Sequence, residues 1–265
     1  SEYPGVRIKS INHETMKIIK EHSRTIDRET VRSELKKEKE AIEIKNKWRH
    51  QDEAADIFIE KKHGILEMAT GTGKTRTALK IAKKLLDSKE IKSIIISTEG
   101  TDLLNQWGNE IADWSRQNQF QWISFFRQYD NYKELEKFNF DEFQILLCSW
   151  YFLPNLFARS VDEKDCLIIH DEVHGLGAEK KIEQLKDTHN IFRYKLGLSA
   201  TPMRDYDDGT KFIENEIGPV IYEFGLKKAI RRGILCEFDY TTIECSMTEN
   251  DKAEQARIIA LKNNP

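Results

Sequence analysis

A third of the 265 residues are charged and the net charge is only −3, so the chain has no global basic signature and any nucleic-acid binding must come from a local groove. No stretch approaches the roughly 18 consecutive apolar residues needed to cross a bilayer, and no signal peptide is visible, so no membrane partner is expected. The four cysteines lack paired metal spacing; Cys148 and Cys166 fall in or beside predicted strands and are expected to be reduced, small apolar residues. We therefore expect a cytoplasmic enzyme.

The first 45 residues differ from the rest of the chain. In Arg28–Lys47 acidic and basic residues alternate, which predicts a solvated helix supported by charge pairs four residues apart. Contact of its basic residues with a nucleic-acid backbone is the alternative to an ordinary surface helix. The chain begins at Ser1 and stops just after a helical pattern, so we expect a fragment of a longer protein.

From Trp48 onward, apolar runs alternate with helical patterns. This alternation implies right-handed crossovers and a mainly parallel sheet with helices on both faces. Ligands of such sheets bind at the carboxyl ends of the strands. Strands are predicted near residues 64–68, 92–97, 122–126, 145–149, 166–170 and 194–198, and helices near residues 51–62, 74–87, 101–115, 130–138 and 178–187.

The segment Met68-Ala-Thr-Gly-Thr-Gly-Lys-Thr75 has the chemistry of a phosphate-binding loop. Its glycines let backbone N–H groups curl around phosphates, Lys74 neutralises the β and γ oxygens, and the Thr75 hydroxyl suits Mg²⁺. The common pattern has glycine where this chain has Met68, and a glycine-rich turn is the alternative. The strand before the loop and the helix after it favour the phosphate site, because the helix N-terminus faces the ligand. The predicted nucleotide-binding residues of the loop are Thr70, Gly71, Thr72, Gly73, Lys74 and Thr75.

A second motif, Asp171-Glu-Val-His174, follows an apolar run that ends at Ile169. Asp171 and Glu172 are therefore expected at the carboxyl end of a buried strand, where Asp171 joins Thr75 in holding Mg²⁺ and Glu172 polarises the attacking water. Positioning and charge stabilisation supply most of the catalysis in phosphoryl transfer. Alone, such a pair is equally typical of a solvated turn. Its order after the loop predicts a nucleotide triphosphatase site with Lys74, Asp171 and Glu172 as catalytic residues.

A third segment, Leu198-Ser-Ala-Thr-Pro202, closes the last predicted strand. The three segments resemble motifs I, II and III of the superfamily 2 helicases and translocases, in the same order. The segment 219–235 is similar to the passage out of the first motor domain in the branch that contains type III restriction subunits and XPB-like repair helicases. The resemblance implies a RecA-like P-loop NTPase fold of three α/β/α layers. The expected domains are a charged helical extension (1–45), the ATP-binding domain (46–225) and a linker toward a missing second RecA-like domain (226–265).

The resemblance also implies a base-reading element at Trp48-Arg-His-Gln51, where Gln51 pairs with the N6 and N7 edge of adenine and Trp48 or Arg49 stacks on the base. Many relatives carry arginine at the position of Trp48. A surface glutamine that caps a helix is the alternative for Gln51.

By the same resemblance, His174 couples the nucleotide site to the third motif through Ser199 and Thr201; an ordinary capping histidine is the alternative. Thr98 and Ser149 end strands that look like the nucleic-acid-contacting motifs of the family, and such contacts fix register without reading sequence. The alternative is helix capping, a role that serine and threonine at strand ends have at least as often as nucleic-acid contact. Trp107, in the helix after Thr98, is expected in the core.

The resemblance implies an ATPase that uses ATP and Mg²⁺ and acts on DNA, with RNA not excluded, to translocate or unwind. A second motor domain supplies an arginine finger in this superfamily, and such a finger is worth roughly 10³–10⁵ in rate for comparable triphosphatases. We therefore expect the isolated chain to bind ATP weakly and to hydrolyse it slowly. The alternatives are a P-loop switch or scaffold that does not track nucleic acid and a catalytically inactive interaction module.

Overall fold

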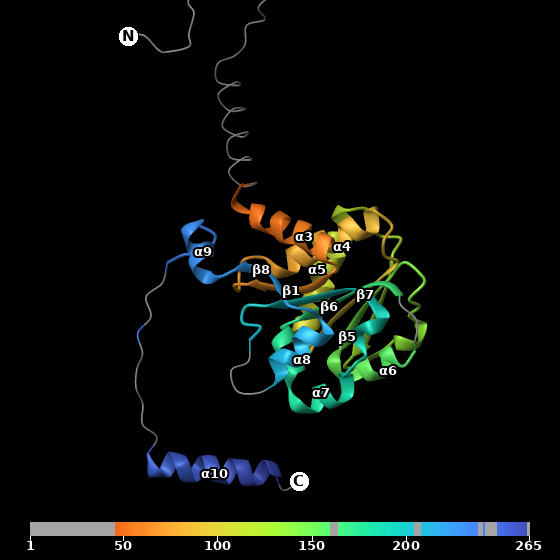
Figure 1. Ribbon diagram of the computed structural model, residues 1–265. Helices are drawn as coiled ribbons and strands as arrows, with labels where there is room; N and C mark the ends of the chain where they lie inside the picture. The colour runs from red at the N-terminus through yellow and green to blue at the C-terminus, as the bar shows by residue number, and fades with distance from the viewer. Residues whose placement is uncertain (1–45, 160–163, 204–207, 238–240, 242–247, 264–265) are drawn as a thin grey trace, which may run out of the picture. The chain divides into compact units, whose positions relative to one another are not determined.

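The computed structural model describes residues 46–159, 164–203, 208–237, 241 and 248–263 (Figure 1). The predicted extension at residues 1–45 lies outside the described residues. The chain divides into two compact units, Ser1–Leu235 and Cys236–Pro265. The second unit contains one described helix, α10 (Glu249–Asn263).

Within the first unit, strands and helices alternate along the chain as expected. The strands are β1 (His63–Met68), β2 (Ser93–Thr98), β3 (Ser124–Tyr129), β4 (Tyr132–Lys133), β5 (Gln144–Ser149), β6 (Lys164–Asp171), β7 (Phe192–Ser199) and β8 (Val220–Phe224). The α-helices are α3 (Arg49–Lys61), α4 (Lys74–Asp87), α5 (Thr101–Gln117), α6 (Leu153–Phe157), α7 (Glu179–Leu185), α8 (Gly209–Glu216) and α9 (Leu226–Arg231). Short 3₁₀ turns are η1 (Leu135–Lys137), η2 (Trp150–Phe152), η3 (Val173–Gly177) and η4 (His189–Ile191).

The strands form one sheet in the order β4-β3-β5-β2-β6-β7-β1-β8. The described pairs are parallel except the hairpin of β3 and β4. Strand β7 lies between β1 and β6, with Ser199 paired to Glu67 on one side and Leu198 paired to Asp171 on the other. The carboxyl ends of these three strands therefore meet at one edge of the sheet, as predicted from the motifs.

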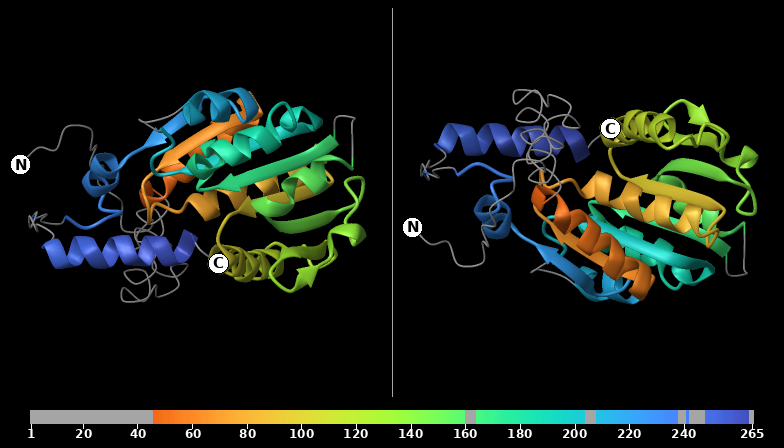
Figure 2. Two further views of the ribbon diagram at one scale, coloured as in Figure 1. Left: turned by 90° about the horizontal axis from the view of Figure 1, so that it is seen from below. Right: turned by 90° about the horizontal axis from the view of Figure 1, so that it is seen from above.

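Helices cover both faces of the sheet (Figures 1 and 2). Helices α3, α4 and α5 pack on one face, where Phe58, Ile81 and Trp107 belong to one buried cluster. Helices α6, α7 and α8 pack on the other face, where Leu156 and Leu185 belong to a second cluster. The predicted three-layer α/β/α arrangement with a mainly parallel sheet is confirmed.

Two predicted elements are wrong in type or extent. The helix predicted at residues 130–138 is a hairpin and a 3₁₀ turn, because Tyr129 pairs with Tyr132 across a two-residue turn and Asp130 has a φ of +49°. Aspartate and asparagine favour such tight turns. The strand predicted at 122–126 begins only at Ser124, and Trp122 before it is 57% exposed.

The exit segment 219–235 contains elements that the pattern did not predict. Strand β8 pairs in parallel with β1, and the N–H of Ala69 donates to the carbonyl oxygen of Phe224. After α9 the chain returns to the same region, where Leu235 Cδ2 lies 3.0 Å from the position that a Cβ on Gly71 would take. The segment thus supports the glycine loop from its edge.

Cys148 and Cys166 are buried free thiols, which confirms the prediction that they are small apolar residues. Burial raises the pKa of Cys166 to about 12, so this thiol stays protonated and unreactive. Among the described residues, no helix has both the length and the apolar character that membrane crossing requires.

Candidate functional site

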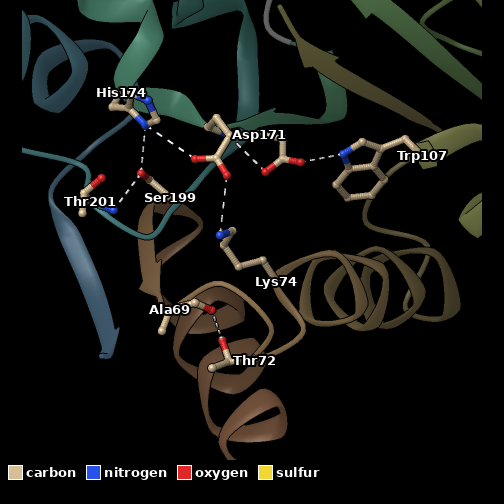
Figure 3. Close-up of polar contacts among 9 residues, drawn as sticks. Ala69, Thr72, Lys74, Trp107, Asp171, His174, Ser199 and Thr201 are labelled. Carbon is tan, nitrogen blue, oxygen red and sulfur yellow. Dashed lines mark hydrogen bonds and ion pairs between the residues drawn. The ribbon is translucent and has the colours of Figure 1, made fainter. Parts of the chain in front are cut away.

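The loop between β1 and α4 has the curled backbone that its glycines predict. Gly71 and Gly73 have φ values of +83° and +88°, in the left-handed region that favours glycine. A Cβ added to Gly73 would lie 2.2 Å from Gln51 Nε2, so this position has no room for a side chain. The Thr72 hydroxyl donates to the carbonyl oxygen of Ala69 at 2.6 Å (Figure 3). The Thr72–Ala69 hydrogen bond therefore supports this curled conformation from within the loop.

Two side chains from α3 reach this loop. Gln51 Nε2 donates to the carbonyl oxygen of Thr72 at 3.2 Å, and His50 Nε2 lies 2.8 Å from the same oxygen. Gln51 is only 3% exposed, which argues against the alternative of a surface capping residue. His50, which the sequence did not single out, is buried and stacks on Phe224 with 4.1 Å between ring centroids. Both residues fix the loop against α3.

The Lys74 ammonium and the Glu172 carboxylate meet at this edge of the sheet, with Nζ 3.6 Å from Oε1. The Lys74 side chain is 11% exposed and that of Glu172 is 37% exposed. Glu172 adopts a φ of +51° directly after β6, a strained backbone conformation for this residue. Such conformations persist where surrounding structure requires them, and here the turn directs the carboxylate toward Lys74.

Asp171, at the end of β6, is buried and its two oxygens accept different hydrogen bonds. The indole Nε1–H of Trp107 donates to Oδ2 at 2.8 Å, and the backbone N–H of Glu172 donates to Oδ1 at 3.0 Å (Figure 3). Burial raises the pKa of Asp171, while the Trp107 hydrogen bond and the Lys74 charge oppose that rise. Trp107 is in the core, as predicted, but it also contacts the acidic motif, which the sequence did not reveal.

The third motif contacts the second through a serine hydroxyl. His174 Nδ1 lies 3.1 Å from Ser199 Oγ, and the same oxygen accepts the backbone N–H of Thr201 at 3.0 Å (Figure 3). His174 Nδ1 also lies 3.5 Å from Glu172 Oε2. His174 therefore stands between the acidic pair and the Ser199–Thr201 turn, a position that an ordinary capping histidine does not explain.

A cleft of about 290 Å³ opens between the loop, the end of β6 and helix α5. Its chemistry fits a Mg²⁺-bound triphosphate: loop N–H groups and an ammonium suit phosphate oxygens, and a hydroxyl and a carboxylate suit the metal ion. Five of its lining residues were not predicted: Arg76, Leu103, Gln106, Trp107 and Glu110. Four come from α5, which follows the end of β2, and the sequence did not predict that this helix reaches the cleft. The predicted lining residues are Thr70, Gly71, Gly73, Lys74, Thr75, Asp171 and Glu172.

A second cavity of about 620 Å³ adjoins the cleft, and Arg76 and Glu110 line both. Trp48 and Gln51 line this second cavity, which places two of the three predicted base-reading residues together. Arg49 instead pairs with Glu53 one turn along α3, at 3.1 Å, with a side chain that is 71% exposed. Of the two residues predicted to stack on a base, Trp48 therefore lies in this cavity and Arg49 does not line it.

The two predicted nucleic-acid contacts lie side by side, because Thr98 at the end of β2 pairs with Ser149 at the end of β5. Thr98 is 1% exposed, and its hydroxyl has no hydrogen-bond partner among the described residues. Ser149 is half-buried. The Thr98 hydroxyl therefore does not reach the surface, and its predicted contact would use the backbone.

The model of one protein family, described as "Type III restriction enzyme, res subunit", matches residues 17–204. The DNA 3'-5' translocase XPB2 of Sulfurisphaera tokodaii is 27% identical over 216 residues, which cover 81% of this chain and 43% of the translocase. Putative helicase 22 of Sulfolobus islandicus filamentous virus is 27% identical over 186 residues, which cover 67% of this chain and 31% of the helicase. The chain thus spans less than half the length of these relatives.

Two solved structures share the fold. The ATP-dependent Type ISP restriction-modification enzyme LlaBIII bound to DNA matches with a TM-score of 0.51 and 19% identity, over 69% of this chain and 15% of that one. The UvsW helicase from bacteriophage T4 matches with a TM-score of 0.50 and 20% identity, over 65% of this chain and 58% of that one. At these identities the likeness concerns the fold, and it confirms the predicted RecA-like class.

Proposed function

We propose that this chain, which belongs to the family of the type III restriction enzyme res subunit, binds ATP and Mg²⁺ in the cleft and acts on DNA. The family places it among the ATP-dependent motor domains of superfamily 2 helicases and translocases. In the intact protein a second RecA-like domain would close over the nucleotide. Cycles of hydrolysis would then move the pair of domains along a strand or separate two strands.

The observation that carries this proposal is the convergence of Lys74, Asp171 and Glu172 on one cleft. Lys74 would contact the β and γ phosphates, and Thr75 with Asp171 would hold Mg²⁺. Glu172 would orient and polarise the attacking water. In phosphoryl transfer such positioning and charge stabilisation carry most of the catalysis. When the nucleotide is bound, phosphate oxygens would compete with Glu172 for the Lys74 ammonium.

The base would enter the adjoining 620 Å³ cavity, where Trp48 and Gln51 lie. The Gln51 amide Nε2 already donates to the Thr72 carbonyl, so its side-chain oxygen is the group that would accept from the adenine N6 amine. Trp48 would stack on the base. Because Gln51 contacts the phosphate loop and lines the base cavity, it would report base identity to the loop.

His174, Ser199 and Thr201 would couple the state of the nucleotide to the rest of the motor. The contact of Ser199 Oγ with both His174 and the Thr201 N–H supports this role. The strand ends at Thr98 and Ser149 would contact the nucleic-acid backbone. The proposal of DNA rests on two relatives that are named as a DNA translocase and as a restriction-modification enzyme bound to DNA.

A P-loop switch that binds nucleotide without tracking nucleic acid is the second candidate. The Lys74, Asp171 and Glu172 arrangement suits both functions. The His174–Ser199–Thr201 contact favours the motor, because a simple switch has no need of a link between the acidic motif and the end of β7.

The test combines nucleotide binding and nucleic-acid stimulation. The 265-residue chain should bind a fluorescent ATP analogue in a Mg²⁺-dependent way and release phosphate slowly, with no brisk stimulation by DNA. A longer protein that includes the second motor domain should release phosphate faster with duplex or single-stranded DNA, and the stimulation should fall as salt rises because phosphate contacts release counterions. Absence of any Mg²⁺-dependent nucleotide binding would sink both candidate functions, whereas binding without DNA stimulation in the longer protein would favour the switch.

A further inference from the structure

Helix α5 carries a side chain that contacts the candidate metal ligand directly. Trp107 is 2% exposed, and its indole N–H donates to Asp171 Oδ2 at 2.8 Å. In Figure 3 the indole points at the Asp171 carboxylate from the side opposite His174. Trp107 also lines the cleft with Lys74 and Glu172, so it stands at the boundary between the core and the site.

The two hydrogen bonds on Asp171 together restrict the rotation of its carboxylate. The Trp107 indole fixes Oδ2 and the Glu172 backbone N–H fixes Oδ1, so turning the carboxylate breaks at least one bond. Each oxygen keeps a further lone pair for a metal ion, since an ionised carboxylate offers about four acceptor sites. A buried, doubly held carboxylate is the arrangement in which outer partners orient a metal ligand.

Packing alone does not account for the choice of tryptophan here. A phenylalanine would fill much of the same core volume without burying an N–H group that needs a partner. Trp150, which is also buried, has an indole nitrogen without a hydrogen-bond partner among the described residues. Burial in this fold therefore does not by itself supply a partner for an indole, and the bond from Trp107 to Asp171 is a specific feature of the site.

We propose that Trp107 is a positioning residue whose indole N–H holds the Asp171 carboxylate in the orientation that receives Mg²⁺. The inference rests on the proposed function, because it requires Asp171 to bind a metal ion. Metal binding would then depend on the placement of α5, the helix that follows the strand end at Thr98.

The test replaces Trp107 with phenylalanine, which removes the N–H donor and keeps an aromatic ring. Binding of a fluorescent, non-hydrolysable ATP analogue is followed by anisotropy while Mg²⁺ is titrated. Loss of an outer partner of a metal ligand typically weakens metal affinity about 10–100-fold. Trp107→Phe should therefore raise the Mg²⁺ concentration at half-maximal binding by about that factor.

Ile111→Val is the matched control, because Ile111 is buried on the same helix in the same cluster and does not line the cleft. It should lower stability without moving the Mg²⁺ midpoint, which separates positioning from general loosening of α5. An unchanged midpoint in Trp107→Phe, with normal binding by the unmodified chain, would overturn this inference alone. Absence of Mg²⁺-dependent binding by the unmodified chain would overturn the proposed function and the inference with it.

A second measurement decides the matter if Trp107→Phe does not fold. The chain has five tryptophans, whose ¹⁵N-labelled indole N–H signals can be followed by NMR. The signal that Mn²⁺ broadens most strongly in the presence of the nucleotide analogue should be that of Trp107, and the same signal should shift when Mg²⁺ is used instead. Indole signals that all stay in place upon Mg²⁺ addition would contradict the proposal.

Discussion

The Lys74 ammonium lies 3.6 Å from the Glu172 carboxylate, although the two residues belong to different strand–loop units of the sheet. Strand β7 separates the strand that ends at the glycine loop from the strand that ends at the acidic pair. The two ends and helix α5 together line the cleft of about 290 Å³ in which a triphosphate and its metal ion would lie.

Lys74→Ala removes the ammonium that faces the phosphates, and we expect it to weaken Mg²⁺–ATP binding sharply. A hydrogen bond to a charged group is worth roughly 1.5–3 kcal/mol, which corresponds to a loss of at least tenfold. Binding is measured with a fluorescent ATP analogue. Lys84→Ala, on the solvent side of the same helix, serves as control and should bind normally. Equal affinity in the two variants would show that Lys74 does not contact the nucleotide.

Glu172→Gln keeps the shape of the side chain and removes its charge and basicity. We expect nucleotide binding to persist while phosphate release falls about 10²–10⁴-fold, the usual contribution of a positioned general base. Phosphate release is measured under single-turnover conditions because the chain is expected to be slow. Glu183→Gln, an exposed carboxylate on α7, should leave the rate unchanged. If Glu172→Gln retains the original rate, the general base is another group.

Gly73→Ala should destabilise the loop and abolish nucleotide binding. The residue has a φ of +88°, and the added Cβ would lie 2.2 Å from Gln51 Nε2. A strained backbone of this kind costs about 1–3 kcal/mol before the steric contact is counted. Gly225→Ala is the control, since nothing lies within 4 Å of its Cβ position. Thermal unfolding should show a lower midpoint for Gly73→Ala only, and equal midpoints would mean that the loop adapts.

A buried histidine pair predicts that stability falls in mild acid. Burial lowers the pKa of both His170 and His189, whose rings lie 5.1 Å apart. Burial by itself raises the pKa of Glu216, but hydrogen bonds that include one from His189 Nδ1 at 2.8 Å lower it overall. The hydrogen bond and charge of Glu216 oppose the lowering of the His189 pKa, and the Lys195 charge adds to it, so the pKa of His189 is lowered overall. The folded chain therefore holds these histidines neutral and this carboxylate ionised.

Stability depends on pH because the folded and unfolded chains bind different numbers of protons. Unfolded histidines take up protons near pH 6.5, so below that pH the unfolded state binds more protons and stability declines as pH falls. Each histidine contributes at most about 1.4 kcal/mol per pH unit. Because the pKa of Glu216 is lowered in the folded chain, stability declines further at lower pH, where the unfolded chain protonates this carboxylate first. Urea unfolding at pH 7.5 and 5.5 measures the loss, which should be smaller in His189→Gln; an equal loss in that variant would contradict the assignment.

Much of the fold follows from local patterns in the sequence. Apolar runs predicted β1, β2, β5, β6 and β7, and helical spacing predicted all of α4, because apolar side chains on a strand or helix face the core wherever that element lies. The glycine loop was predictable for a different local reason, since only glycine adopts the φ values of residues 71 and 73 at low cost. The helix predicted at 130–138 failed because a two-residue turn overrides helical spacing.

The sequence by itself determined which residue types serve the site: a lysine and a threonine after a glycine loop, and an acidic pair after a buried strand. Only the tertiary structure decided that Gln51 is buried against Thr72, that Trp107 bonds to Asp171, and that β8 adds an edge next to β1. These contacts join residues that are far apart in the chain. Their existence depends on strand order and register, which are set by the packing of the whole sheet and leave no local periodic signal.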